Sequence, residues 1–260
     1  MGERTQYTPG TFSWTDLTTT DQAGAKQFYA ALFGWEAEDL PVGDGGMTYS
    51  MQRVDGKNVA AISQQPQQQA EAGVPPMWNS YVSVESADAA AERAAELGAT
   101  VHAPPFDVME AGRMAVIQDP QGAFFEVWEP RQNIGAGLVN APGAMCWNEL
   151  ASPDVEGSRE FYSGLFDWQV EPYDGTGQPY WVIQNAGHGN GGVREAMPPG
   201  TPPHWLVYFA CEDLDAAVAR VEQHGGATVM GPMDIRIARI AVVQDPQGAT
   251  LCLYDGQLED

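Results

Sequence analysis

The chain has 260 residues, of which 43% are hydrophobic and 10% aromatic, and its formal net charge is −23. This length predicts two domains of ordinary size with real cores, while the negative charge argues against a nucleic-acid partner, whose phosphates would be repelled. No apolar run approaches the roughly 20 residues of a membrane span, and the first ten residues lack the pattern of a secretory signal. Three cysteines without a Cys-x-x-Cys spacing favour reduced thiols. We therefore expect a cytoplasmic protein with no membrane partner.

The chain contains an internal duplication. The stretch from Trp14 to Trp35 returns as Trp147 to Trp168, with matched residues at a constant offset of 133. Further along, Gln118 to Ala123 recurs letter for letter at residues 244–249. Constant spacing over such lengths is the mark of repeated structure. The sequence therefore predicts two copies of one domain.

The first copy begins with a predicted strand and helix. Large apolar and small polar residues alternate from Gly10 to Thr18, which is typical of a strand. Thr20 or Asp21 can cap the helix that follows, and Gly34 suits the left-handed position at its end. The apolar stripe of this helix has helical spacing and consists of Ala25, Phe28, Tyr29, Leu32 and Phe33.

Strand-like segments follow this helix, at Met47 to Val54 and Asn58 to Ile62, with Asp55-Gly56 as a hairpin turn between them. A weaker strand is expected from Trp35 to Asp39. The order is therefore β-α-β-β-β. The Gln-rich stretch from Gln64 to Gly73 lacks apolar periodicity and predicts a linker.

The same order is predicted a second time within the first half. A strand (Trp78 to Val84), an Ala-rich helix (Asp88 to Leu97) and three more strands near residues 100–103, 114–118 and 124–128 complete it. The second half repeats the series, with a linker from Arg194 to Pro203. The fold class is α+β, with four βαβββ modules. We predict domains at residues 8–131 and 143–260, joined by a linker at 132–142.

These features resemble one known family. An acidic residue, a Phe-Tyr pair and a Leu-Phe-x-Trp phrase are joined to a later Asp-Pro-x-Gly turn in each half. This combination resembles the vicinal oxygen chelate superfamily, which includes glyoxalase I, extradiol dioxygenases, and fosfomycin and bleomycin resistance proteins. The tandem copies look particularly like duplicated glyoxalase-like proteins of actinobacteria. The resemblance implies two tandem glyoxalase-like domains, each with a sheet curled into a cup that holds the ligand.

The resemblance also places the family's metal ligands, and the sequence departs from them. Three positions in each half can be aligned, and they fall on Trp14, Asn79 and Glu126 in the first half and on Trp147, Leu206 and Cys252 in the second. Tryptophan and leucine cannot coordinate a metal, and a catalytic divalent ion needs about three good protein ligands. We expect no metal and no other cofactor in either cup.

Pleating with period two predicts which other side chains face the cups, since Asp16 shares a face with Trp14. The expected lining of the first cup is Trp14, Asp16, Tyr49, Asn79, Tyr81, Phe124, Glu126 and Trp128. The expected lining of the second cup is Trp147, Glu149, Tyr180, His204, Leu206, Tyr208, Cys252 and Tyr254. Aromatic walls with a few polar groups suit a flat organic ligand.

Each of these residues also has a plainer interpretation. The tryptophans could simply fill the cups, and Cys252 could be a small buried hydrophobe instead of a nucleophile. Glu126 and Asp16 could form a catalytic acid–base pair or a pair of solvated carboxylates. Arg113 and Arg239, which precede matched strands, could reach an anionic ligand or lie on the surface.

The sequence therefore predicts metal-independent binding of small aromatic molecules in two cups, with sequestration of the kind found in resistance proteins as the leading interpretation. The alternative is a glyoxalase-type lyase, isomerase or dioxygenase that uses Glu126 as a residual metal ligand or as an acid–base group. Whether the chain is an enzyme is left open at this stage. The expected partner is a small molecule, and the expected state is a monomer or a weak homodimer.

Overall fold

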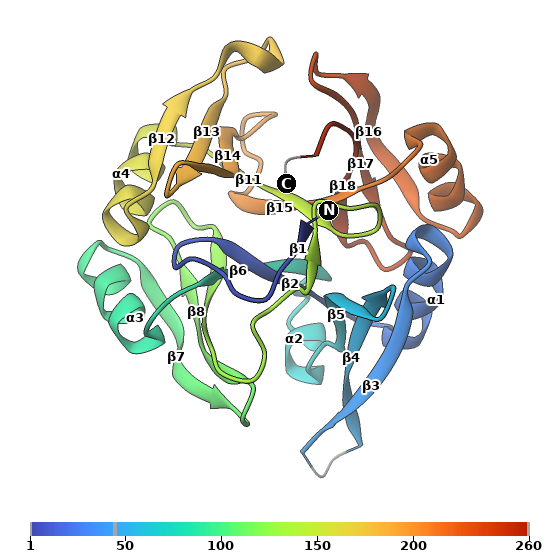
Figure 1. The fold of residues 1–260 in the computed structure, drawn as a ribbon, viewed down its shortest axis with the longest axis horizontal. Coiled ribbons are helices and arrows are strands. Elements are labelled where there is room, and N and C mark those ends of the chain that lie inside the picture. Colours follow the sequence, from blue (N-terminus) through green and yellow to red (C-terminus); the bar gives the residue numbers. More distant parts are fainter. Residues whose placement is uncertain (1, 44–45, 259–260) are drawn as a thin grey trace.

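Each half of the chain forms one sheet of eight strands. The computed structural model describes residues 2–43 and 46–258, so the predicted end of the second domain at residue 260 lies outside the described residues. Helices flank both sheets, and a small two-stranded sheet joins the N-terminal segment to the connection between the halves (Figure 1). The predicted α+β fold is confirmed.

The first half is built from two modules that share a sheet. The elements of the first are β2 (Phe12–Thr19), α1 (Gln22–Phe33), β3 (Glu36–Val42), β4 (Met47–Val54) and β5 (Lys57–Gln64). Those of the second are β6 (Met77–Ser83), α3 (Ala87–Glu96), β7 (Thr100–Val108), β8 (Gly112–Gln118) and β9 (Phe124–Pro130). The strand order is β3-β4-β5-β2-β6-β9-β8-β7, with β2 and β6 antiparallel at the centre. The two modules therefore pair within one half.

The second half repeats this sheet. Its third module contains β11 (Met145–Ser152), α4 (Val155–Phe166), β12 (Gln169–Pro172), the 3-10 turn η1 (Asp174–Thr176), β13 (Trp181–Asn185) and β14 (His188–Glu195). Its fourth contains β15 (His204–Ala210), α5 (Leu214–Gln223), β16 (Ala227–Asp234), β17 (Ala238–Gln244) and β18 (Thr250–Gly256). The order is β12-β13-β14-β11-β15-β18-β17-β16, which matches the first sheet strand for strand.

The predicted caps of the first helix in each half are present. The Asp21 carboxylate accepts a hydrogen bond from the Gly24 amide at 2.9 Å, and Gly34 ends α1 with a φ of 73°. In α4, Asp154 has the same role, whereas Asp167 takes the left-handed position with a φ of 58°. An acidic residue tolerates this conformation better than most non-glycine residues. Both helices bury their Phe-Tyr pair.

Three segments differ from the sequence prediction. The expected Gln-rich linker contains a short helix, α2 (Gln67–Glu71), which fits the good helix propensity of Gln, Ala and Glu. The linker between the halves contains β10 (Leu138–Val139), which is buried and pairs with β1 (Gly2–Glu3) near the N-terminus. Arg194 was expected in a linker but lies in β14, because this strand gains a parallel partner in β11.

A single hydrophobic core extends across both halves. Helix α1 lies beside α5 and α3 beside α4, so each of these two helices of the first half packs next to a helix of the second (Figure 1). Phe33 of the first half contacts Phe209 of the second at 5.3 Å between ring centroids, and Phe12 contacts Trp205 at 4.9 Å. The halves therefore depend on each other for apolar burial.

Two buried polar links join the halves in a pseudo-symmetric way. The Tyr29 hydroxyl accepts a hydrogen bond from Trp78 Nε1 at 3.0 Å and donates to Asp245 Oδ2 in the other half at 3.1 Å. Tyr162 likewise links Trp205 and Asp119. Each aspartate comes from an Asp-Pro-Gln-Gly turn, so the repeated turn motif of one half binds the repeated tyrosine of the other.

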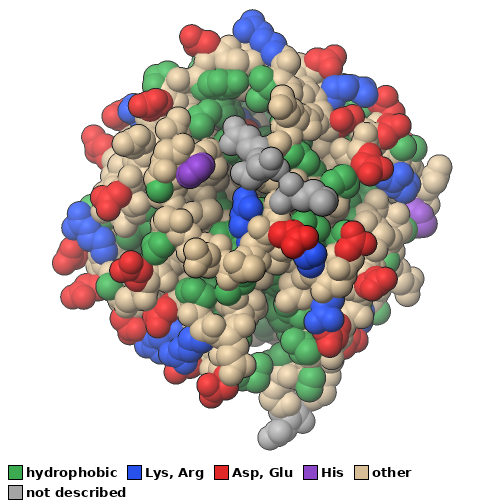
Figure 2. Space-filling view, in the orientation of Figure 1, with side chains coloured by type: hydrophobic (Ala, Val, Ile, Leu, Met, Phe, Trp, Pro, Cys, Tyr) green, Lys and Arg blue, Asp and Glu red, His purple; other side chains and the backbone are tan. Residues whose placement is uncertain are grey.

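The surface agrees with the composition. Acidic side chains are spread around the face seen in Figure 2 and do not gather in one patch. Over residues 2–43 and 46–258, no helix is long and apolar enough to cross a bilayer.

Candidate functional site

The first cup is organised around Asp16, at the centre of its sheet. The carboxylate accepts three hydrogen bonds, from Asn79 Nδ2 at 2.7 Å, from the Tyr49 hydroxyl at 2.8 Å and from the Tyr81 hydroxyl at 2.9 Å. Trp14 Nε1 donates to the Tyr49 hydroxyl at 2.9 Å and extends this network. Burial raises the pKa of Asp16, and the three donors oppose that rise. Five of the residues predicted to line this cup are thus brought together.

Glu126 lies in the same cup but has a different environment. It is 5% exposed, it neighbours Tyr81 across the β6–β9 pairing, and its Oε2 atom has no hydrogen-bond partner among the described residues. Burial, and next the negative charge of Asp16, raise the pKa of Glu126 well above its usual range. Glu126 therefore keeps its proton to a higher pH than an exposed glutamic acid does.

Two other predicted lining residues lie away from this network. Phe124 is 41% exposed at one end of β9, where its ring contacts His102 at 4.8 Å. Trp128 is buried at the other end, with Nε1 donating to the Asn133 carbonyl at 2.8 Å. A Cβ atom on Gly112 would lie 2.4 Å from the Trp128 ring, so this ring packs directly on the β8 backbone. Both aromatic residues flank the polar centre of the cup.

The second cup has a charged centre that is internally neutralised. Glu149 occupies the place of Asp16, and its Oε1 atom forms an ion pair with Arg194 Nε at 2.5 Å. Its Oε2 atom accepts a hydrogen bond from the Tyr208 hydroxyl at 2.8 Å. Tyr180 also faces Glu149, and its hydroxyl accepts from Trp147 Nε1 at 2.9 Å. Both carboxylate oxygens of Glu149 therefore have partners within the protein.

Apolar side chains pack together beside the charged centre of the second cup. Leu206 and Cys252, which replace Asn79 and Glu126, pack with Tyr208 in a buried cluster. Burial, and next the charge of Glu149, raise the pKa of Cys252 well above its usual range, so the thiol is protonated and inert. Trp147 and Tyr254 pack against this cluster. His204 lies apart from it, half-buried at the start of β15, with Nδ1 2.8 Å from the Pro202 carbonyl.

Arg194 is the main residue that the sequence analysis missed. In the sheet register, Glu149 pairs with Gly192 and Ala151 with Arg194, so Arg194 lies two residues along the same face. The corresponding pairs in the first half are Asp16 with Ala61 and Thr18 with Ser63. The first cup thus has a serine where the second has the arginine.

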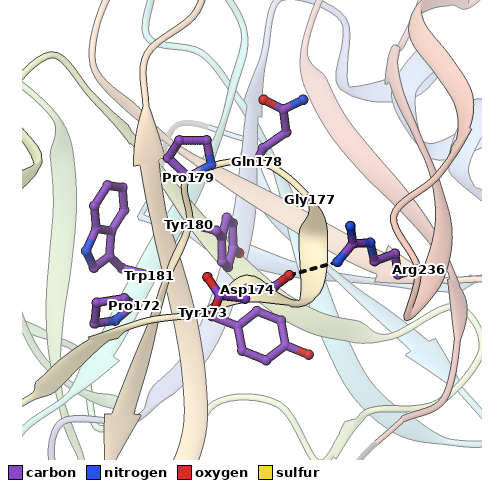
Figure 3. Close-up of a pocket in the computed structure, with 9 residues that line it drawn as sticks. All are labelled: Pro172, Tyr173, Asp174, Gly177, Gln178, Pro179, Tyr180, Trp181 and Arg236. Atoms are coloured by element: carbon purple, nitrogen blue, oxygen red, sulfur yellow. Dashed lines mark hydrogen bonds between the residues drawn. The ribbon is translucent and has the colours of Figure 1, made fainter.

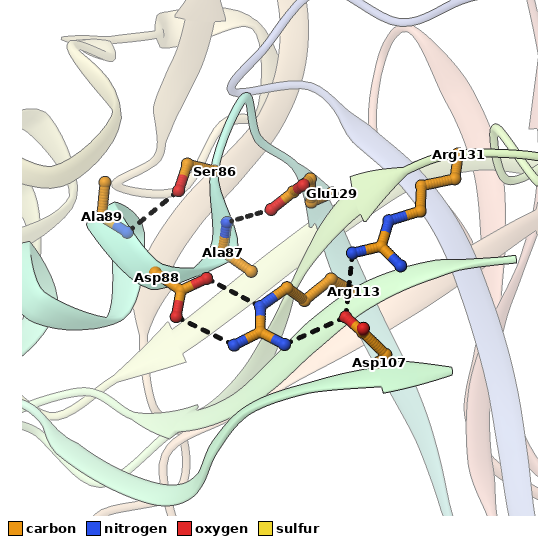
Figure 4. Close-up of polar contacts among 8 residues, drawn as sticks. All are labelled: Ser86, Ala87, Asp88, Ala89, Asp107, Arg113, Glu129 and Arg131. Carbon is orange, nitrogen blue, oxygen red and sulfur yellow. Dashed lines mark hydrogen bonds and ion pairs between the residues drawn. The ribbon is translucent and has the colours of Figure 1, made fainter. Parts of the chain in front are cut away.

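The arginines that precede the matched strands do not reach the cups. Arg113 forms ion pairs with Asp88 at 2.7 Å and with Asp107 at 3.0 Å (Figure 4). Arg239 pairs with Asp215 at 2.9 Å in the equivalent place. Arg131 joins the first network through Asp107. The surface interpretation of Arg113 and Arg239 is the correct one, since each cation ties a helix start to a neighbouring strand.

The donor set of neither cup fits a divalent metal. Among the described residues there is no group of three or more His, Cys, Asp or Glu side chains that could hold an ion. In the first cup both oxygens of Asp16 already accept hydrogen bonds, and the amide nitrogen of Asn79 points at them. Glu126 would remain as one carboxylate beside a second that is already bonded, fewer than the three ligands a catalytic ion needs.

Comparison with known proteins identifies relatives over almost the whole chain. A family model for the Glyoxalase/Bleomycin resistance protein/Dioxygenase superfamily matches residues 11–127 and 145–253. The chain is 42% identical over 251 residues to "Putative glyoxylase CFP32" of Mycobacterium tuberculosis, covering 96% of both proteins. It is 35% identical over 264 residues to "Anthracycline biosynthesis protein DnrV" of Streptomyces peucetius, covering 94% of this chain and 93% of that protein.

Solved structures show the same fold at low identity. A Mn(II)-bound glyoxalase from Novosphingobium aromaticivorans matches 100% of this chain and 84% of its own, with a TM-score of 0.65 and 16% identity. The 2,3-dioxygenase LapB from Pseudomonas matches 98% of this chain and 95% of its own, with a TM-score of 0.65 and 14% identity. These likenesses concern the arrangement of the modules.

Proposed function

The chain belongs to the glyoxalase/bleomycin resistance protein/dioxygenase superfamily, and from that premise we propose that it binds small aromatic organic molecules without a metal, with the first cup as the binding site. The proposal narrows the sequence-based expectation, which placed ligands in both cups. The second cup contains the same framework, but its carboxylate is ion-paired with Arg194, and Leu206 and Cys252 replace Asn79 and Glu126.

The unpartnered oxygen of Glu126 carries this proposal. A buried polar atom without a hydrogen bond costs about 1–3 kcal/mol, so a partner that supplies the missing bond is strongly favoured. Its raised pKa favours the protonated form, in which Glu126 would donate to a carbonyl or phenol oxygen of the ligand. Trp14, Tyr49 and Tyr81 supply aromatic surface around that bond.

The name of one kind of relative supports this ligand class. The name of the Streptomyces relative places that protein in the biosynthesis of anthracyclines, which are aromatic compounds. Binding without turnover would amount to sequestration of such a compound. An aromatic ligand that carries a carbonyl group would pack its ring against the aromatic side chains of the cup and accept a hydrogen bond from Glu126.

A second candidate function is an enzyme of glyoxalase type, which the name of the mycobacterial relative suggests. The observation in its favour is the difference between two neighbouring carboxyl groups. Glu126 has a raised pKa and an oxygen without a partner, whereas Asp16 is held by three donors. Such a pair could move a proton on a bound carbonyl compound. The donor set does not support the version in which Glu126 is a residual metal ligand.

Titration calorimetry with two ligands of similar shape tests the binding proposal. We expect 2-acetylnaphthalene, an aromatic ketone, to bind more tightly than 2-isopropylnaphthalene, which cannot accept a hydrogen bond. Glu126→Leu should weaken the ketone about tenfold and leave the hydrocarbon unaffected, whereas Glu126→Gln keeps a donor and should retain most of the ketone affinity.

The matched control is Cys252→Ser, which changes the equivalent position of the second cup and should leave both affinities unchanged. Equal binding of the ketone to wild type and Glu126→Leu would refute the proposal. Recovery of the ketone unaltered after incubation would favour sequestration over catalysis on that compound, and a protein-dependent product would favour the enzyme.

A further inference from the structure

The rim of the second cup contains a cavity that is distinct from its filled interior. Its volume is about 400 Å³, and it lies between the loop that joins β12 to β13 and the turn that joins β16 to β17. Tyr173, Asp174, Tyr180 and Arg236 are among the residues that line it. This volume is in the range of small-molecule sites.

Arg236 is the distinctive residue of this cavity. Figure 3 shows its guanidinium reaching from the β16–β17 turn toward the β12–β13 loop, where Nη1 donates to the Asp174 carbonyl at 3.2 Å. Arg236 makes no ion pair within residues 2–43 and 46–258, whereas Arg194 and Arg239 both have carboxylate partners. A guanidinium has five N–H donors in a fork that matches a carboxylate. One of these donors bonds to the Asp174 carbonyl, and the side chain is otherwise exposed.

The backbone holds Arg236 in this place at an energetic cost. Its φ is 67°, a left-handed conformation that is uncommon for residues other than glycine, asparagine and aspartate. The neighbouring Ile235 packs against the apolar cluster of the second cup and anchors the turn. On the opposite side, a Cβ atom on Gly177 would lie 3.6 Å from Arg236 Nε and Nη2, so the guanidinium rests close to this backbone. The turn presents the cation in a fixed direction.

The other wall of the cavity is aromatic. Tyr173 is 36% exposed, and a Cβ atom on Gly175 would lie 2.3 Å from its ring, so the ring lies flat on the η1 turn. Tyr180 extends from the cavity to the Glu149 network of the cup below. Pro172 and Pro179 complete the apolar surface. These groups suit the face of an aromatic ring.

We propose that this rim cavity binds planar aromatic carboxylates, with the carboxylate on Arg236 and the ring against Tyr173 and Tyr180. Asp174 contributes a carboxylate to the lining and disfavours an anion placed away from Arg236, which fixes the orientation of the ligand. The net charge of −23 also opposes an anion, but at physiological salt this repulsion is screened beyond about 8 Å, and the direct contact with Arg236 prevails.

Calorimetric titration of the full chain with 2-naphthoate and with its neutral analogue 2-naphthamide tests this site. We expect 2-naphthoate to bind more tightly than 2-naphthamide. Arg236→Gln should weaken 2-naphthoate about tenfold and leave 2-naphthamide unchanged, because it removes one charge-assisted contact. Tyr173→Leu should weaken both compounds, since it removes the aromatic wall and keeps the cation.

The control is Arg131→Gln, which makes the same change in net charge at an exposed residue of the first half and should leave both affinities unchanged. Glu126→Leu should also leave 2-naphthoate binding unchanged, which separates this site from the proposed first-cup site. The proposal is overturned if 2-naphthoate binds no better than 2-naphthamide, or if Arg236→Gln binds it as wild type does while its far-ultraviolet circular dichroism is unaltered.

Discussion

Replacing Glu126 by glutamine should stabilise the protein, and the gain should grow with pH. Glu126 is buried beside Asp16, and both burial and that neighbouring charge raise its pKa in the folded protein. In the unfolded chain the same group has a pKa of about 4.3. Above that pH the unfolded state gains free energy by ionising, while the folded state keeps its proton. Glutamine has a similar shape and does not titrate.

Proton linkage gives the direction and the size of this change in the free energy of unfolding. A group with a raised folded pKa favours folding fully below its unfolded pKa, and that contribution is lost as pH rises towards the folded pKa. Between these two values the wild type loses about 1.4 kcal/mol per pH unit relative to Glu126→Gln. The difference should therefore grow at this rate as pH rises from 5, until the folded pKa of Glu126 is reached.

Urea unfolding followed by tryptophan fluorescence at pH 5, 6 and 7 measures this difference. The matched control is Glu149→Gln in the second cup, where the carboxylate is ion-paired with Arg194 and bonded to Tyr208. Losing that pair should destabilise the protein by about 1–3 kcal/mol, so the two variants should change stability in opposite directions at pH 7. A constant difference between wild type and Glu126→Gln across this pH range would show that Glu126 is ionised in the folded state.

Three further outcomes follow from buried contacts. Tyr29→Phe and Tyr162→Phe should each lower the free energy of unfolding by about 1–3 kcal/mol in urea titrations. Each change leaves a tryptophan N–H and an aspartate oxygen unpaired between the halves. A loss below the error of the measurement would mean that water replaces the hydroxyl. Gly192→Ala should destabilise by about 1–3 kcal/mol in the same assay, since the new Cβ would lie within 2.0 Å of the Tyr180 hydroxyl. Cys252 is fully buried and has a raised pKa, so it should react with a thiol reagent at pH 8 only after unfolding. Rapid reaction of Cys252 itself in the native protein would contradict its burial.

Local signals predicted much of the framework. The limits of α1 were predicted from the cap at Asp21, the helical spacing of the apolar stripe and the glycine at residue 34. The turn between β4 and β5 was predicted from Asp55-Gly56. Pleating with period two correctly placed Trp14 and Asp16 on one face. These features depend on neighbours within a few residues, which the sequence displays directly.

Features that depend on long-range pairing were missed. The Gly-rich segment before Arg194 has the composition of a loop, but it pairs with the neighbouring β13, and Arg194 itself pairs with β11 from more than forty residues away. Strand propensity is dominated by such context. The repeated Tyr29 and Asp-Pro-Gln-Gly motifs were visible, but no local pattern shows that each tyrosine binds the turn of the opposite half.

The difference between the two cups is an argument about function as well as about stability. The second cup shows that this framework can fill its interior, with Arg194 opposite the central carboxylate and Leu206 and Cys252 in place of polar groups. The first cup keeps a buried acid without a partner in the same framework, at a cost of about 1–3 kcal/mol. A residue that opposes folding where an apolar alternative fits is expected at a site of function. The asymmetry of the duplicated halves therefore points to Glu126 as the group that meets the ligand.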